Sequence, residues 1–150
     1  MSNDDEEYMA IALEQAGLAL LAGEAPVGAS LVRDGEVLAA ANGVIAELDP
    51  TAHAELRVIR EAARRWRQLD LAGARLYVTV EPCAMCRAAC HYAGITQIVF
   101  GARLQDLHAL TGNELGRPVS NDQGAVSITG DCCRDQCLDL LQAWAARRAN

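Results

Sequence analysis

The stretch that decides the fold spans residues 74–101 and reads ARLYVTVEPCAMCRAACHYAGITQIVFG. Its β-rich run LYVTVE predicts a buried strand, Pro82 suits the first turn of a following helix, and Gly94 marks the end of that helix. The apolar run ITQIVFG then predicts a second buried strand. A helix between two such strands implies a right-handed crossover, so this stretch predicts a partly parallel sheet.

The segments before this stretch add two further helices and an antiparallel edge. Residues 4–24 begin with acidic side chains and continue with apolar residues at helical spacing, which predicts an amphipathic helix. Residues 28–42, GASLVRDGEVLAAAN, place Asp34-Gly35 between two apolar runs, a strong signal for a β-hairpin. A break at Pro50 precedes another helical run.

The segments after it predict a long loop, a short strand and a last helix. Residues 102–124 are polar and contain glycine, residues 125–129 read AVSIT, and residues 131–150 have acidic residues early and arginines late. Loops of this length often bind ligands. Together the elements predict one α/β domain over residues 1–150, with helices on both faces of a mixed sheet.

Composition and charge narrow the range of partners and compartments. The 150 residues are 51% hydrophobic and 22% charged, which is typical of a globular domain. The net charge of -7 makes nucleic acid an unlikely partner, although a local basic patch could bind it, and favours a small-molecule substrate. The acidic start lacks the pattern of a signal peptide, and no apolar run is long enough to span a membrane. We therefore expect a cytoplasmic protein whose cysteines are reduced or metal-bound.

Two short motifs predict a metal site. His53 and Glu55 open one predicted helix, and Cys83 and Cys86 open another, so all four lie at helix N-termini, where the dipole favours thiolates. One histidine and two cysteines are three ligands, which is typical of a catalytic Zn²⁺ whose fourth ligand is water. Glu55 is then suited to carry protons between that water and a substrate.

Other interpretations of the same residues stay open on spacing alone. The CxxC pair could be redox-active, or it could be half of a structural zinc site. The other half would come from the C-terminal cysteines, at positions 132, 133 and 137. Acidic residues beside these C-terminal cysteines argue against a redox sensor there, and we expect a structural role for them.

The motifs HAE and EPCAMC match the zinc-deaminase signature H-x-E…P-C-x-x-C. With DPTAHAE, LYVTVEPCAMC and QIVFGAR, the chain resembles the cytidine-deaminase-like superfamily from about residue 25 to residue 103. The branch it resembles holds guanine deaminases, fungal-type cytosine deaminases and tRNA adenosine deaminases. The resemblance implies a three-layer α/β/α sandwich with a mixed five-stranded sheet, zinc bound by His53, Cys83 and Cys86, Glu55 as the proton carrier, and a homodimer.

The resemblance also implies substrate-binding residues. Asn42 matches an asparagine that hydrogen-bonds the base, and the backbone around Ala54 would help to orient the base. An acid in the loop, Asp106 or Glu114, could accept the N–H groups of guanine.

The substrate that we favour from the sequence is a free nucleobase or a related aminated heterocycle, of guanine or cytosine type. The enzyme would be a zinc hydrolase that releases ammonia from a cyclic amidine. One alternative is a tRNA-specific adenosine deaminase, for which the run RRWR at residues 64–67 is the best nucleic-acid patch. We favour a solvated helix end with Trp66 turned inward for that run. A further alternative is a non-catalytic zinc-stabilised module.

Overall fold

The architecture comes from a computed structural model that describes residues 2–111, 127 and 129–148. The chain divides into two compact units, Met1–Pro118 and Val119–Asn150, and each unit is described by itself. The elements of the first unit are α1 (Asn3–Leu21), β1 (Gly28–Arg33), β2 (Glu36–Ala41), α2 (Ala54–Trp66), β3 (Arg75–Val80), α3 (Ala84–Tyr92), β4 (Gln97–Ala102) and α4 (Leu104–Thr111).

The four strands that the structure describes form one mixed sheet in the order β2-β1-β3-β4. β1 pairs antiparallel with both β2 and β3, whereas β3 and β4 are parallel and connected through α3. The predicted mixed sheet, the hairpin and the parallel crossover are therefore confirmed. At the hairpin, Asp34 and Gly35 both have positive φ, 51° and 81°, as a two-residue type I′ turn requires.

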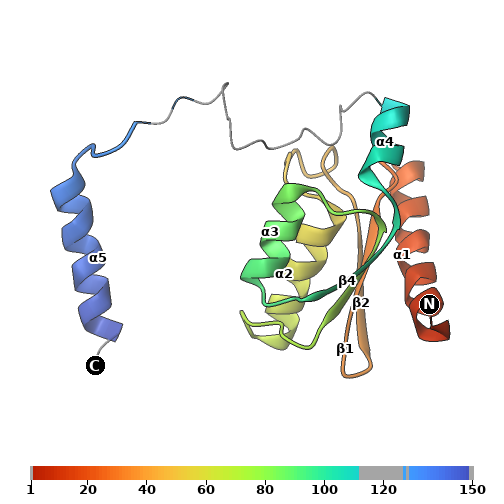
Figure 1. The fold of residues 1–150 in the computed structure, drawn as a ribbon, viewed down its shortest axis with the longest axis horizontal. Coiled ribbons are helices and arrows are strands. Elements are labelled where there is room, and N and C mark those ends of the chain that lie inside the picture. Colours follow the sequence, from red (N-terminus) through yellow and green to blue (C-terminus); the bar gives the residue numbers. More distant parts are fainter. Residues whose placement is uncertain (1, 112–126, 128, 149–150) are drawn as a thin grey trace. The chain divides into compact units, whose positions relative to one another are not determined.

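The helices of this unit lie on both faces of the sheet (Figure 1). α1 covers one face, while α2 and α3 lie beside each other on the opposite face. Strand residues alternate between the two: Leu31 and Leu76 join the core beneath α2, whereas Ser30 and Tyr77 face α1. On the α1 side, Ser30 Oγ donates a hydrogen bond to the Tyr8 carbonyl at 2.9 Å.

The main core combines short side chains from the helices with branched residues from the strands. The small side chains let the α2 backbone approach the sheet closely, which fixes the position of its first turn. The buried core residues are Ala29, Leu31, Leu38, Ala40, Ala54, Val58, Ala62, Leu71, Ala74, Leu76, Val78, Cys90, Ala93 and Ile95.

Two sequence expectations differ from the structure or lie outside it. Residues 104–111 of the expected loop form the helix α4. Two carboxylates stabilise its first turn: Asp106 accepts a hydrogen bond from the Arg103 N–H group, and Glu81 accepts one from the Leu104 N–H group. The expected fifth strand, residues 125–129, falls mostly outside the described residues, so the described sheet has four strands.

The second unit contains α5 (Arg134–Arg148), the helix expected at the C-terminal end. The three cysteines near its start, Cys132, Cys133 and Cys137, are exposed when this unit is taken by itself, and the structural role expected for them stays a prediction. In the part of the chain that is described, no helix combines the length and the apolar character that crossing a membrane requires.

Candidate metal centre

The predicted metal ligands meet where two helices begin. His53 is the N-cap of α2, and Cys83 is the N-cap of α3, directly after β3 and Pro82. Both residues have extended backbone conformations, with ψ of 151° and 172°, and neither side chain caps its own helix. Because α2 and α3 lie against the same face of the sheet, their first turns bring the two side chains together.

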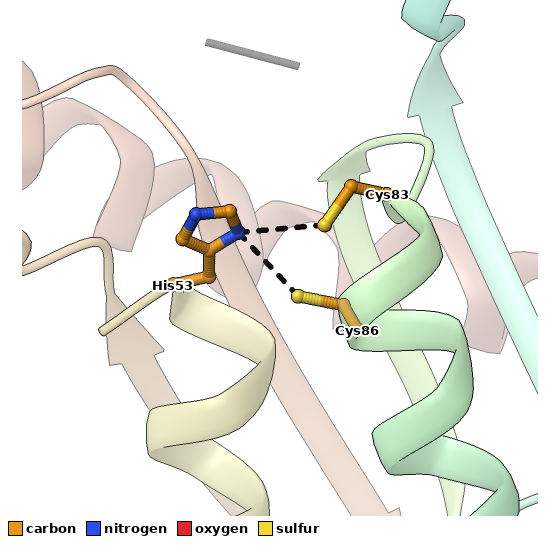
Figure 2. A group of neighbouring side chains, drawn as sticks. All are labelled: His53, Cys83 and Cys86. Atoms are coloured by element: carbon orange, nitrogen blue, oxygen red, sulfur yellow. Dashed lines mark hydrogen bonds between the residues drawn. The ribbon is translucent and has the colours of Figure 1, made fainter. Parts of the chain in front are cut away.

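The geometry of the three side chains fits a zinc ion. His53 Nδ1 lies 3.7 Å from Cys83 Sγ and 3.5 Å from Cys86 Sγ, as Figure 2 shows. Tetrahedral zinc with ordinary Zn–N and Zn–S bonds separates its nitrogen and sulfur ligands by about 3.6 Å. All three ligand atoms lie within 4.8 Å of one another. The donor set and the two nitrogen–sulfur distances therefore match zinc.

The pKa values of the two thiols are shifted in opposite directions. A hydrogen bond from Cys86 lowers the pKa of the Cys83 thiol to about 4, with a further contribution from His53. The same hydrogen bond, together with burial, raises the pKa of Cys86. The hydrogen bond to Cys83 raises the pKa of His53. Because a thiolate is the form that binds a metal, Cys83 is the thiol that is ready for a cation near neutral pH.

Glu55 lies in the first turn of α2 and is only 3% exposed. Its Oε1 atom is buried and has no hydrogen-bond partner among the described residues. Burial raises the pKa of this carboxyl group above its ordinary value. A buried carboxyl oxygen without a protein partner is costly in a purely structural role, and it suits a group that exchanges a proton with a bound molecule.

Two of the predicted substrate-binding residues lie at the same edge of the sheet as the metal ligands. Asn42 directly follows β2 and is buried; its side chain donates to the Ala25 carbonyl at 3.4 Å. The next residue, Gly43, donates its N–H to the Ala52 carbonyl at 3.0 Å, which connects this strand end to the residue before His53. Ala54 is fully buried as the first residue of α2.

The structure describes one of the two predicted loop acids, Asp106. Asp106 is exposed in the first turn of α4, where it accepts a hydrogen bond from the Arg103 N–H at 2.9 Å. Glu114 lies outside the described residues. A substrate contact for either residue stays a prediction.

Sequence patterns missed the residues that hold the segment before His53 in place. The buried Glu24 carboxylate accepts hydrogen bonds from the N–H groups of Ile45 at 2.7 Å and Ala46 at 3.3 Å. Asp49 Oδ1 accepts from the Thr51 N–H and hydroxyl groups at 2.8 and 2.7 Å. The Asp49 contact could have been inferred from the DPT motif as an Asx turn, but nothing local indicates that Glu24 contacts a segment 21 residues away.

Known proteins resemble this chain in sequence and in fold. A tRNA-specific adenosine deaminase of Aquifex aeolicus is 45% identical over 98 residues, which are 65% of each protein, so the match spans just under two thirds of that relative. A tRNA-specific adenosine deaminase of Buchnera aphidicola is 32% identical over 99% of this chain and 92% of its own length. The X-ray structure of guanine deaminase from Bacillus subtilis superposes with a TM-score of 0.80 at 27% identity, over 97% of this chain and 95% of that chain.

The zinc-site residues all lie in the segment that a family model recognises. The model describes the cytidine and deoxycytidylate deaminase zinc-binding region, and it matches residues 2–102, which include His53, Glu55, Cys83 and Cys86. The match agrees with the zinc-like spacing of the three ligands. The chain therefore belongs to the cytidine and deoxycytidylate deaminase zinc-binding family.

Proposed function

We propose that this protein is a zinc-dependent hydrolytic deaminase whose substrate is an adenosine presented in tRNA. The observation that carries the deaminase activity is the zinc-like His53–Cys83–Cys86 cluster beside the buried, unpartnered Glu55 oxygen. The tRNA substrate is supported by relatives named tRNA-specific adenosine deaminase, one of them matched over 92% of its length. The comparisons thus support the alternative drawn from the sequence better than the free nucleobase that the sequence favoured.

In this proposal the chain's own residues position the base and move its protons. When bound, zinc supplies the Lewis acidity that makes hydroxide available near neutral pH. Glu55 takes one proton from the attacking water to the ring nitrogen, and a second from the new hydroxyl group to the leaving amine. A C–O bond forms, the C–N bond breaks, and ammonia leaves. Asn42 and the backbone at Ala54 orient the base, because they lie at the same sheet edge as His53.

A second candidate is deamination of free guanine. It is supported by the likeness to guanine deaminase, which covers nearly the whole of both chains at a TM-score of 0.80. This candidate shares the zinc site and Glu55 with the first. The two differ in the carbon that is attacked, C6 of adenine or C2 of guanine, and in whether the base is free or held in RNA.

Ammonia release from zinc-loaded protein distinguishes these candidates. The panel contains a tRNA anticodon stem–loop with an adenosine in the loop, free adenosine, and the bases adenine, guanine and cytosine. The proposal predicts release from the stem–loop and little from the free compounds. Release from guanine alone would replace it with the second candidate. No release from any compound by fully zinc-loaded protein would contradict both and favour a non-catalytic zinc module.

A further inference from the structure

A groove of about 850 Å³ lies between α2 and the free edge of β2, and it is rich in arginine. Four arginines line it, Arg57, Arg60, Arg64 and Arg65, against two glutamates. The lining therefore carries a net positive charge in a chain whose formal net charge is -7. A local charge opposite in sign to that of the whole protein points to an anionic ligand.

The groove follows α2, the helix whose N-cap is His53. Its near end holds Arg57, which follows Glu55 by two residues and whose N–H donates to the His53 carbonyl at 3.0 Å. Its far end holds Arg65, which contacts Glu36 at the start of β2. With 1.5 Å of rise per residue, Arg64 lies about 16 Å along α2 from His53.

One wall of the groove is a strand edge that has no neighbour among the described strands. The two-residue turn makes Arg33 and Glu36 a hydrogen-bonded pair, so by alternation Val37, Ala39 and Ala41 direct their backbone groups outward. The Arg57 guanidinium donates to the Ala41 carbonyl, which agrees with this register. Polar backbone groups therefore line the wall opposite the arginines.

The arginines differ in how far the protein itself engages them. Arg57 is held by the Ala41 carbonyl and by Glu47 at 3.1 Å, and it shapes the near end of the groove. Arg60 is exposed, and its only ion pair in the described part of the chain is a loose one of 3.8 Å to Asp49. Arg64 is exposed and has no ion-pair partner within that part. Arg60 and Arg64 thus retain donors for an external anion.

We propose that Arg60 and Arg64 bind the phosphate backbone of the RNA strand that presents the target base to the zinc site. This inference rests on the proposed function and adds the surface that holds the RNA. A strand whose flipped-out base reaches His53 and Glu55 would pass the start of α2, and Arg60 and Arg64 lie further along the same helix, where they can meet its phosphates. Guanidinium groups suit phosphate because they present several donors in a planar fork.

The test compares a double variant with a control that removes one arginine charge outside the groove. Arg60→Gln with Arg64→Gln removes both charges and keeps good helix formers at exposed positions, while Arg87→Gln removes one exposed charge on α3, outside the groove. Binding of the zinc-loaded proteins to the labelled anticodon stem–loop is measured over a series of salt concentrations. Zinc content and sedimentation are measured on the same samples.

The double variant should lower the slope of log affinity against log salt by about 1.4, since each single-strand phosphate contact contributes about 0.7. If the two proteins have the same affinity when it is extrapolated to 1 M salt, the double variant binds the stem–loop about 25-fold more weakly than the wild type at ~0.1 M salt. Arg87→Gln should behave as the wild type. A slope equal to that of Arg87→Gln would overturn the inference, and so would a changed oligomeric state, which would assign the groove to a second copy.

The two proposals fail in different ways. If the wild-type protein neither binds nor deaminates the stem–loop, the proposed function is wrong. If it deaminates the stem–loop and the double variant keeps the full salt slope, only the groove is wrongly assigned. A groove that holds an acidic peptide would give this second result, and the wild type would then bind polyglutamate more tightly than the double variant does. That outcome would likewise overturn the RNA assignment.

Discussion

Replacing Gly28 with alanine should destabilise the protein although the backbone conformation there suits any residue. Gly28 opens β1 where the strand passes closest to α1, and a Cβ at this position would lie 2.1 Å from the Ala12 carbonyl oxygen and 2.4 Å from the Ala16 nitrogen. Both atoms belong to helix backbone, so no side chain can turn away. The strand and α1 must separate by about 0.9 Å to restore a contact of 3.0 Å.

The expected cost follows from the packing that this separation disturbs. Overpacking a core typically costs about 1–3 kcal/mol, and a rigid backbone neighbour places Gly28→Ala near the upper end. For a domain of this size, about 3 kcal/mol lowers Tm by roughly 10 °C. The shift also strains the hydrogen bond from the Gly28 N–H to Thr79 Oγ1, at 3.1 Å, near the end of the strand that leads to Cys83.

Gly17→Ala is the matched control, because the same added methyl group should have the opposite effect. Gly17 is exposed within α1, and a Cβ there meets nothing within 4 Å. Alanine should therefore stabilise the helix by up to about 1 kcal/mol. Thermal and urea unfolding of the two variants check both signs. A Gly28→Ala protein as stable as the wild type would refute the close packing of α1 on β1.

Three further predictions concern the thiols, zinc removal and pH. In zinc-free protein, alkylation followed by peptide mass spectrometry should modify Cys83, whose pKa is about 4, well before the buried Cys90, whose pKa burial raises to about 11; equal rates would contradict this. Cys83→Ser should lower zinc affinity and Tm, and a variant that retains stoichiometric zinc with an unchanged Tm would refute the ligand assignment. The Tyr77 hydroxyl donates a hydrogen bond to the Asp5 carboxylate at 2.7 Å and lowers the pKa of Asp5 below its ordinary value. This contact therefore stabilises the fold at pH values above the pKa of Asp5 in the unfolded chain. The stabilisation is lost as the pH falls through the lower pKa of Asp5 in the folded protein. The stability difference between wild type and Asp5→Asn in urea titrations should therefore disappear in acid, and a difference that persists there would argue against it.

The parts of the site that could be predicted are those that depend on residues close together in the sequence. HAE and PCAMC each place their side chains within one turn of a helix, and the strand signals on either side of α3 place that helix start at the end of a parallel strand. The Asp34-Gly35 turn is equally local. The zinc cluster could be anticipated because each half needs only a few neighbouring residues to form.

The parts that could not be predicted depend on contacts between distant residues. Glu24 holds the segment before His53 through a contact across 21 residues, and the Asp5–Tyr77 hydrogen bond spans 72 residues. α4 was missed because its glycine-containing polar surroundings indicate a loop, whereas its first turn depends on a carboxylate 23 residues upstream, that of Glu81. The homodimer stays a prediction.

The arginines on α2 are grouped differently by the sequence and by the structure. In the sequence, the run at residues 64–67 indicates a solvated helix end, and Trp66 does pack against the core, with its indole N–H donating to Glu36 at 2.8 Å. The structure places Arg64 and Arg65 of this run in one groove with Arg57 and Arg60. Helical spacing of the arginines, rather than their adjacency, defines the charged surface.

The measurement that tests the central claim most directly is ammonia release from the anticodon stem–loop by zinc-loaded wild type and Glu55→Gln, with zinc quantified in both. The substitution keeps the size and burial of the side chain but removes its ability to carry a proton. We expect full zinc occupancy in both proteins and a loss of at least 10²- to 10⁴-fold in turnover for the variant. Comparable turnover by Glu55→Gln at equal zinc occupancy would contradict the proposed mechanism.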